Sequence, residues 1–446
     1  MARLRHPRSR TRRNDRECRL HWREERRGPG DASLVECRLT FTTGCQGLAS
    51  ESDSCGRLAV LSLRAGCTLP LPTKIRGVKV TIVGAGIVGT AIAYELGARG
   101  ATVSLVDVRG SGQGATQASA GILAPYIEGH SANLLQLGVS SLAQYDSFVA
   151  RVAADAGRPV EYRRLGTLQV ARTDGEVQLL REAARTLQAS SVSHTCLDGD
   201  RARALQPSLS ECVCGALRVP DQGYVGVASL MTALQAAVGS HGTTVSTARV
   251  TDIVRRGGKV RVETGEDPGS AEGLVADAVI VAAGSWSSGI SMSPAVSPPV
   301  RPVRGQLLQL RVPGPPLTHV IWGTAVYLVP WEDGSVLVGA TVEDVGFDAR
   351  VTVAGVRQLL ESAEALVPMV GSATFDGARV GLRPATVDDM PIIGPSSTMP
   401  GVYYATGHYR SGVLLAPLTA SMMADLVLDG HECAELALVR PDRPGL

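Results

Sequence analysis

The feature that most constrains this chain is the pattern Gly-x-Gly-x-x-Gly at 84–89, which stands inside a complete predicted βαβ unit. An apolar strand at 78–83 precedes it, a helix pattern follows, and a second strand at 103–106 ends in Asp107. The three glycines permit a tight turn, a close approach of the backbone to a pyrophosphate, and close packing of helix on strand. The helix N-terminus favours phosphate charge, and Asp107 can accept hydrogen bonds from ribose hydroxyls. The sequence therefore predicts dinucleotide binding.

Length and charge limit the possible classes of protein. The chain has 446 residues, which is enough for two domains. Residues 1–76 hold 16 basic and 8 acidic side chains, whereas the remainder holds 28 and 34. A mildly acidic body argues against nucleic-acid binding, which calls for a basic face. The most apolar stretch, 412–428, contains Pro417 and Asp425, so we expect no membrane span.

The first 76 residues differ from the rest. Eleven arginines fall within the first 27 positions, mixed with acidic residues, and no apolar core or small-residue cleavage site of a secretory signal follows. Helical or strand periodicity is absent to about position 72. We expect either a disordered extension or upstream DNA translated because the start was placed too early. Five of the nine cysteines lie here, and none suggests a disulfide framework, so we expect a cytoplasmic protein.

The remaining pattern predicts an α/β fold. The continuous apolar run at 278–284 is typical of a buried parallel strand and is expected to join the sheet of the first two strands. Alternation between turns at 303–339 indicates antiparallel strands. A strand at 402–405 and a helix at 412–428 close the chain. We expect a discontinuous Rossmann-like dinucleotide-binding domain (77–160, 220–290 and 378–432) with an inserted antiparallel α+β substrate domain (161–219 and 291–377).

Seven motifs together resemble the D-amino-acid-oxidase-like flavoproteins, and most closely the glycine oxidases of bacterial thiamine-thiazole synthesis. The resemblance covers about 78–432. It implies FAD rather than NAD, bound non-covalently, because no cysteine lies between Cys214 and Cys433 to attach a flavin. The motifs are Gly84–Gly89, Ala118–Pro125, Pro302–Gln306, Tyr327–Pro330, Val338–Thr341, Gly381–Pro384 and Gly407–Pro417.

The resemblance also implies which residues contact FAD. Asp107 stands where the family usually has Glu, and a shorter carboxylate can still bind two hydroxyls. The pyrophosphate and ribose group contains Gly84, Gly86, Ile87, Val88, Gly89, Asp107 and Val108, and Val250 matches the position that holds the adenine. The flavin group contains Ala115, Thr116, Ala120, Gly121, Ile122, His408, Tyr409, Arg410, Ser411, Gly412, Val413 and Leu414.

The implied reaction is oxidative deamination of glycine, or of small amines such as sarcosine and D-alanine, with O2 giving an imine or 2-oxo acid, ammonia and H2O2. Arg383 is the candidate for a bidentate clamp on the substrate carboxylate, since its planar fork matches that group. Tyr327 and Arg410 are further substrate candidates, and His408 is assigned to cofactor contact alone. Each of these side chains also has an ordinary structural interpretation, as an ion pair or a core residue. Two family positions differ here, at Ala325 and Val342, which opens the question of strict glycine preference.

Other functions remain open at this level. The chain resembles D-amino-acid and sarcosine-type oxidases as well, and a dehydrogenase that passes electrons to quinones has the same motifs. A non-catalytic flavoprotein subunit is a third possibility, disfavoured because it has no use for a carboxylate clamp. An NADPH-using monooxygenase requires a second dinucleotide fingerprint, which is absent. We expect a homo-oligomer without a metal site, since the eight histidines are scattered.

Overall fold

The expected βαβ unit forms as β1 (Lys79–Val83), α1 (Ile87–Ala98) and β2 (Thr102–Asp107) in the computed structural model, which describes residues 77–128, 131–265 and 273–446. β1 lies between β2 and β13 (Ala278–Val281), parallel to both, so the apolar run does join this sheet. The six-stranded sheet has the order β20-β21-β13-β1-β2-β9, completed by β20 (Ile392–Pro395), β21 (Val402–Thr406) and β9 (Thr244–Thr247).

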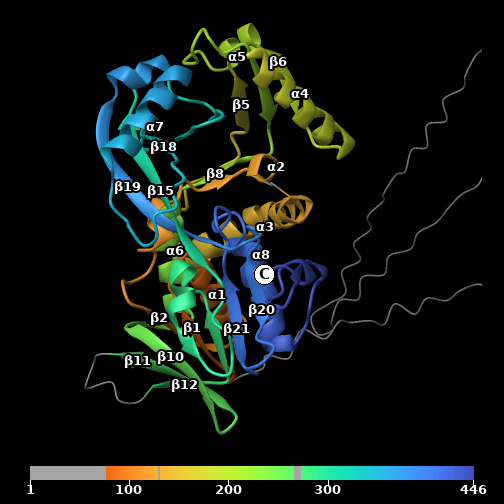
Figure 1. Cartoon of the computed structure of the whole chain (residues 1–446), viewed down its shortest axis with the longest axis vertical. Helices are drawn as coiled ribbons and strands as arrows, with labels where there is room; N and C mark the ends of the chain where they lie inside the picture. Colours follow the sequence, from red (N-terminus) through yellow and green to blue (C-terminus); the bar gives the residue numbers. More distant parts are fainter. Residues whose placement is uncertain (1–76, 129–130, 266–272) are drawn as a thin grey trace, which may run out of the picture. The chain divides into compact units, whose positions relative to one another are not determined.

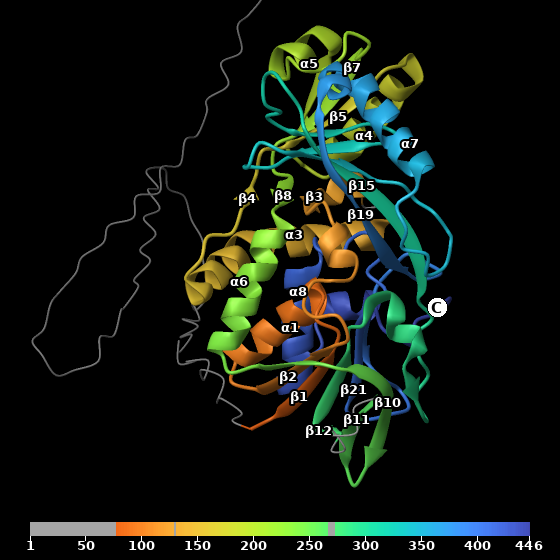
Figure 2. The ribbon, with the colours of Figure 1, turned by 90° about the vertical axis from the view of Figure 1, so that its left-hand side faces the viewer.

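Both faces of the central strands β1, β13 and β21 are covered, which is why these strands are mostly apolar. Val80 and Ile82 pack in one core with α1, α3 (Ala132–Ala156), α6 (Val227–Ser240) and α8 (Ala416–Ala424). Val83 packs on the other side, against the hairpin of β10 (Arg249–Arg256) and β11 (Lys259–Gly265). Figure 2 shows the helices and the hairpin on opposite sides of β1. The hairpin sheet is completed by β12 (Leu274–Ala276) and β14 (Ser291–Met292).

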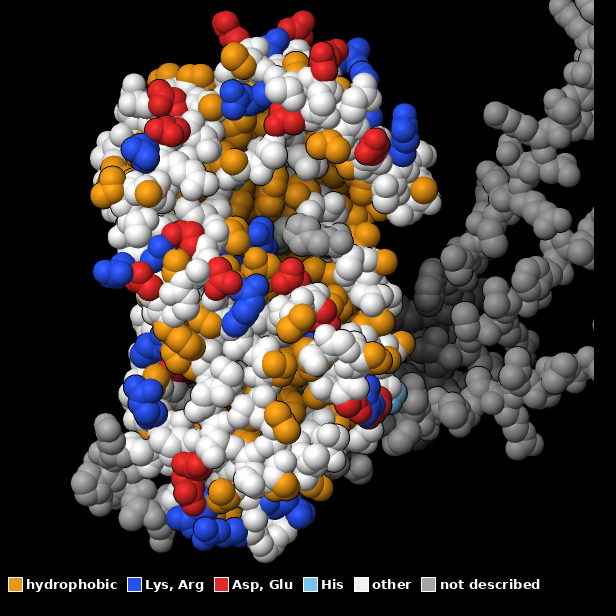
Figure 3. Space-filling view, viewed as in Figure 1, with side chains coloured by type: hydrophobic (Ala, Val, Ile, Leu, Met, Phe, Trp, Pro, Cys, Tyr) orange, Lys and Arg blue, Asp and Glu red, His pale blue; other side chains and the backbone are white. Residues whose placement is uncertain are grey.

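A second, eight-stranded sheet forms the other layer, with the order β19-β15-β18-β17-β16-β5-β7-β6. Its long strands β15 (Arg301–Arg311) and β19 (Thr374–Ala385) pair antiparallel along their whole length and reach towards the six-stranded sheet (Figure 1). Figure 3 shows hydrophobic side chains gathered in a hollow between this layer and α3. The other strands are β18 (Val336–Gly339), β17 (Tyr327–Pro330), β16 (Val320–Trp322), β5 (Thr167–Ala171), β7 (Gly215–Val219) and β6 (Thr195–Asp198).

Smaller elements complete the layer. Helices α4 (Asp174–Ala189), α5 (Gly199–Leu205) and α7 (Val353–Leu366) pack on the eight-stranded sheet. A three-stranded sheet contains β3 (Ile122–Leu123), β8 (Gly223–Val225) and β4 (Tyr162–Arg163), and α2 (Pro125–Glu128) follows β3. The described residues all fall in one compact unit, so the domain boundaries given above stay a prediction. Expectations for residues 1–76 lie outside the described residues.

The last helix begins later than the sequence pattern indicates. We expected it at Gly412, but α8 starts at Ala416, and the backbone from Ser411 to Leu415 makes hydrogen-bonded turns. Pro417 explains the difference, because proline lacks an N–H and is suited to the first turn of a helix. Among the described residues, no helix has both the length and the apolar character needed to cross a bilayer.

Candidate active site

A cavity lies at the carboxyl ends of β1, β2 and β13, bounded on its far side by β19. Ligands of open parallel sheets bind at this edge. The predicted residues that line it are Gly84, Gly86, Ile87, Val88, Asp107, Ala115, Thr116, Ala120, Tyr327, Arg383, His408, Tyr409, Arg410, Gly412 and Val413. Those outside its lining are Gly89, Val108, Gly121, Ile122, Val250, Ser411 and Leu414.

The glycine turn is fixed by close backbone contacts. Gly84 has φ +110°, and a Cβ there would stand 2.3 Å from the carbonyl oxygen of Ala282. A Cβ at Gly89 would stand 1.9 Å from the carbonyl oxygen of Gly84. Both positions therefore exclude any larger side chain. Gly89 lies outside the cavity because it supports the packing of α1 against the turn.

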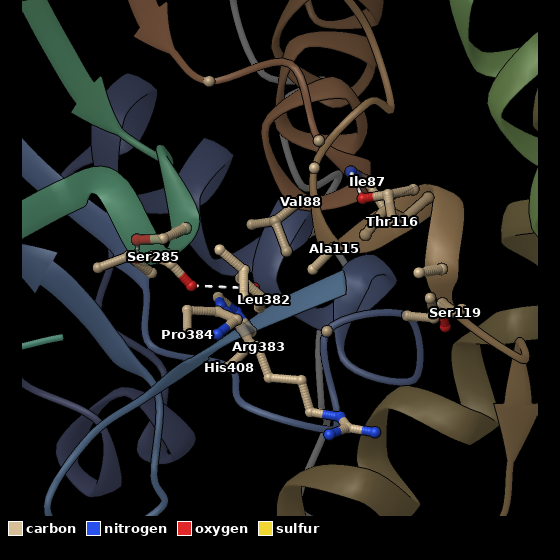
Figure 4. Close-up of a pocket in the computed structure, with 18 of the residues that line it drawn as sticks. Ile87, Val88, Ala115, Thr116, Ser119, Ser285, Leu382, Arg383, Pro384 and His408 are labelled. Carbon is tan, nitrogen blue, oxygen red and sulfur yellow. Dashed lines mark hydrogen bonds between the residues drawn. The ribbon is translucent and has the colours of Figure 1, made fainter. Parts of the chain in front are cut away.

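Asp107 ties the turn to the end of β2. Its carboxylate accepts hydrogen bonds from the backbone N–H of Ala85 (2.9 Å) and of Arg109 (2.8 Å). The hydroxyl of Thr116 accepts from the N–H of Ile87 at 3.0 Å, at the start of α1. Figure 4 shows Thr116 beside Ile87, with Val88 and Ala115 turned towards the same space. A helix N-terminus and an adjoining carboxylate are thus aligned along one wall of the cavity.

Arg383 enters the cavity from β19. A Cβ on Gly305 would stand 2.3–2.5 Å from three guanidinium atoms, so the side chain of Arg383 lies directly over this glycine of β15. Its Nη1 donates to the carbonyl oxygen of Thr341 at 3.0 Å and to that of Arg304 at 3.3 Å. The guanidinium therefore lies across β15 at Gly305, and a side chain on any other residue at position 305 would obstruct it.

Tyr327 is placed in the same way. A Cβ on Gly339 would stand 2.4 Å from its hydroxyl oxygen, and its ring packs on Trp322 with centroids 5.1 Å apart. Arg410 follows Tyr409, which has φ +47°, and its guanidinium carbon lies 5.2 Å from the Tyr409 ring centroid. Tyr327, Arg383 and Arg410 are thus brought to one cavity from three distant segments. Ala325 and Val342, the two departures noted in the sequence, are exposed and outside its lining.

A family model described as FAD dependent oxidoreductase matches residues 79–426. The chain belongs to this family. The resemblance drawn from the sequence is therefore confirmed, and FAD is the cofactor of this oxidoreductase.

Individual relatives agree. The chain is 32% identical to a glycine oxidase of Geobacillus kaustophilus over 80% of this chain and 95% of that protein. It is 34% identical to the bifunctional protein ThiO/ThiG of Synechocystis sp. over 78% of this chain, and it spans about half (51%) of that longer relative. Among solved structures, the glycine oxidase of Geobacillus kaustophilus superposes with a TM-score of 0.78 at 30% identity, covering 82% of this chain and 99% of that one. The iminodiacetate oxidase of Chelativorans sp. BNC1 gives 0.75 at 27%, covering 81% and 98%.

The donor groups of the cavity fit FAD. Gly86, Ile87 and Val88 bring the N-terminus of α1 to one end, which suits a pyrophosphate. Asp107 lies at the end of β2, where a ribose hydroxyl needs an acceptor, and each oxygen keeps a second lone pair beyond its bond to the backbone. The small side chains of Ala115, Ala118, Ser119 and Ala120 also line the cavity and leave room for a planar ring.

Several lining residues were not found by sequence reasoning. The guanidinium of Arg109 stacks over the indole of Trp286, 3.7 Å from its centroid, and both line the cavity. Ser285 donates its hydroxyl to the carbonyl of Leu382 at 2.9 Å, which joins the loop after β13 to β19 (Figure 4). Ser285 and Trp286 could have been predicted from their place in the sequence, because they directly follow the carboxyl end of a buried parallel strand, where ligands bind.

His408 is a neutral imidazole inside this oxidoreductase. The side chain is buried and its Nε2 lies 3.1 Å from the hydroxyl of Thr419. Burial disfavours the charged form and lowers the pKa of His408 to about 4, against 6.5 for an ordinary histidine. A neutral ring whose Nε2 contacts the Thr419 hydroxyl agrees with a role in lining the site.

His408 makes stability depend on pH. Between pH 6.5 and 4, His408 is protonated in the unfolded chain but stays neutral in the folded chain. The contribution of His408 to the free energy of unfolding is therefore fully present above pH 6.5 and is lost as the pH falls towards 4. We expect this group to remove about 2 kcal/mol between pH 7.5 and pH 5. Urea denaturation at both pH values should show a smaller loss in His408→Asn than in the parent. His431→Asn, at an exposed histidine, is the control. An equal loss in all three proteins would contradict the assignment.

Proposed function

We propose that this enzyme oxidises glycine and other small amino acids by removing hydride from the α-carbon, with release of ammonia and a 2-oxo acid. The observation that carries the proposal is Arg383, a guanidinium held over Gly305 in the cavity that fits FAD. Bound FAD supplies the acceptor of the hydride. The glycine oxidases among the relatives support the same substrate class.

The side chains divide the work of binding. Arg383 pairs with the substrate carboxylate through two parallel N–H···O bonds, and the hydroxyl of Tyr327 donates to the same group. Arg410 adds a second positive charge at the cavity wall. Leu382 and Pro384, which flank Arg383, are buried and exclude water from the α-carbon. Fixing the carboxylate in this way places the α-carbon at one point, which removes the entropic cost of alignment.

A protein base is not required. Among the described residues that line the cavity, Asp107 is the sole carboxylate, and it binds the glycine turn. His408 is the sole imidazole there, and its Nε2 faces Thr419. Hydride removal from a neutral amine leaves an iminium, and water then hydrolyses this iminium to the 2-oxo acid and ammonia. The substrate therefore reacts as the free amine, and the enzyme selects this form by desolvation.

We extend the proposal to the remaining features of the reaction. The electron acceptor is O2, which gives H2O2, and FAD is held without a covalent bond. The imine formed from glycine is used in thiamine-thiazole synthesis, as the resemblance to that group of glycine oxidases suggests. The enzyme is a homo-oligomer and lies in the cytoplasm. Sarcosine and D-alanine are alternative substrates, because the same carboxylate clamp accepts them. A dehydrogenase that uses a quinone would share this reductive half-reaction, but the glycine oxidases among the relatives do not favour it.

The test is a peroxide assay on the purified holoprotein. We expect H2O2 to form with glycine, sarcosine and D-alanine but not with methylamine, because methylamine has no carboxylate for Arg383 to bind. After anaerobic reduction by glycine, mixing with O2 in a stopped-flow instrument should restore the oxidised flavin spectrum within the turnover time. Slow reoxidation by O2 and fast reoxidation by a soluble quinone would favour the dehydrogenase. Equal rates with methylamine and glycine would contradict the substrate class.

A further inference from the structure

A buried polar network lies around Glu343, which no motif singled out. Its Oε2 accepts from Nη2 (2.5 Å) and Nε (3.2 Å) of Arg304. Its Oε1 accepts from the amide of Gln306 (2.7 Å) and the hydroxyl of Thr341 (2.5 Å). The side chains of Arg304, Gln306 and Thr341 are all buried. One carboxylate thus receives four hydrogen bonds, far more than a surface ion pair makes.

The same residues tie down the backbone after β18. Arg304 and Glu343 exchange two backbone hydrogen bonds of 2.8 and 3.0 Å. The N–H of Thr341 donates to the carbonyl of Gln306 at 3.1 Å, and the N–H of Gln306 donates to the Thr341 hydroxyl at 2.9 Å. Residues 341–343 therefore continue alongside β15, and the side chains fix their register.

This segment carries the acceptor for Arg383. The carbonyl oxygen of Thr341 accepts a hydrogen bond from Nη1 of Arg383 at 3.0 Å, and the guanidinium lies over Gly305. Successive side chains of a strand point to opposite faces, so Arg304 and Gln306 project to the face opposite the guanidinium. The network of Glu343 lies behind β15 and the clamp lies in front of it. A shift of the segment behind the strand would move the Thr341 carbonyl, and with it Arg383.

Charge gives the network a second effect. Arg304 is buried and its Nη1 also pairs with Asp348 at 3.0 Å. A buried guanidinium that loses a carboxylate partner leaves a charge that must be compensated by movement of nearby groups or water. The Arg304 carbonyl is itself an acceptor of Arg383, at 3.3 Å. Removing the charge of Glu343 therefore disturbs both carbonyls that receive the Arg383 guanidinium.

We propose that Glu343 is a positioning residue for the substrate carboxylate clamp, acting on Arg383 through the carbonyls of Thr341 and Arg304. This inference rests on the proposed function of Arg383. Glu343 does not line the cavity. It sets the angle at which the guanidinium fork faces the cavity, and so it determines how tightly a carboxylate binds.

The variant Glu343→Gln tests the proposal with little change of size. We expect KM for glycine to rise about tenfold, the effect of losing one hydrogen bond to a charged group, while kcat changes much less. Glycolate, a carboxylate without an amine, should perturb the flavin spectrum with a dissociation constant weakened by the same factor. The flavin content should not change. Glu361→Gln, on the exposed face of α7, is the matched control and should behave as the parent.

A double-mutant cycle separates positioning from general damage. If Glu343 acts through Arg383, then Glu343→Gln should add less than twofold in KM to an Arg383→Lys background, although it costs about tenfold alone. The same tenfold cost in both backgrounds would overturn the inference and leave the proposed function intact. A normal KM in Arg383→Lys alone would instead overturn the proposed function. Should Glu343→Gln yield no folded holoprotein, Thr341→Val replaces it in the cycle; this variant removes one of the four hydrogen bonds to Glu343 and the acceptor of the Gln306 N–H.

Discussion

Arg383→Lys is expected to lower kcat/KM for glycine by roughly 30- to 1000-fold, because about 2–4 kcal/mol of charge-assisted hydrogen bonding to the carboxylate is lost. An ammonium is a point charge, and it cannot reproduce the planar fork that meets a carboxylate with two parallel bonds. Lysine also fails to reach across Gly305 with the same geometry. The measurement is steady-state H2O2 production, with flavin absorbance as the check that FAD stays bound.

The penalty should be nearly the same for glycine, sarcosine and D-alanine, because all three present the same carboxylate. Arg379→Lys is the matched control, since Arg379 lies on the same strand but binds Gln309 outside the cavity. Arg379→Lys should keep kcat/KM within about twofold of the parent, because Arg379 does not line the cavity that binds the substrate. Near-normal efficiency of Arg383→Lys on its best substrate would show that Arg383 is structural.

The dinucleotide-binding half was predictable because its signals are local. The turn at 84–89, the strands on both sides and the carboxylate at Asp107 stand within 30 residues, and each contact follows from the spacing. The apolar run that became β13 needed no partner to be recognised as a buried strand. The hairpin of β10 and β11 turns at Gly257 and Gly258, which both have positive φ, so its turn too depends on local residues.

The strand that carries Arg383 was harder to predict. β19 contains Asp376, Gly377 and Arg379, so it has no continuous apolar alternation, and its outer half is exposed or half-buried. Its conformation comes from pairing with β15, whose residues lie 63 to 84 positions earlier in the chain than their partners, from Arg311↔Thr374 to Arg301↔Ala385. Such a partner lies outside any local window. The motif around Arg383 was recognised by resemblance to the family, whereas the strand β19 that contains it was not predicted.

The site shows the same limit at single residues. Arg109 and Trp286 lie 177 positions apart, and only the fold stacks them at the cavity wall. Glu343 was unremarkable among the acidic residues of its loop, although it receives four hydrogen bonds once the segment lies along β15. Sequence patterns identify backbone requirements such as Gly84, because these depend on the residue itself. Side-chain pairings depend on the tertiary arrangement that brings two segments together.

Gly305→Ala is expected to lower kcat/KM for carboxylate substrates by about 100-fold, because a displacement of about 1 Å of a positioning group has that effect. The new Cβ would stand 2.3–2.5 Å from the guanidinium of Arg383, so the two cannot coexist. The obstructed atoms are the end of a flexible side chain rather than backbone, and φ at this position is not in the left-handed region. The strand is therefore expected to survive, with Arg383 turned away. Peroxide assays with glycine measure the loss.

The space around the new Cβ distinguishes Gly305 from glycines at which alanine is tolerated. Gly239→Ala, at a helical position with open space around the new Cβ, is the matched control, and it should keep full activity and gain up to about 1 kcal/mol of stability. Flavin content should stay the same in both variants, since neither glycine lines the cavity. In an Arg383→Lys background, Gly305→Ala should cost much less than 100-fold, because the clamp it displaces is already gone. A full additional loss there would mean that Gly305 acts on the strand itself, and the close approach of guanidinium and glycine would then be incidental to catalysis.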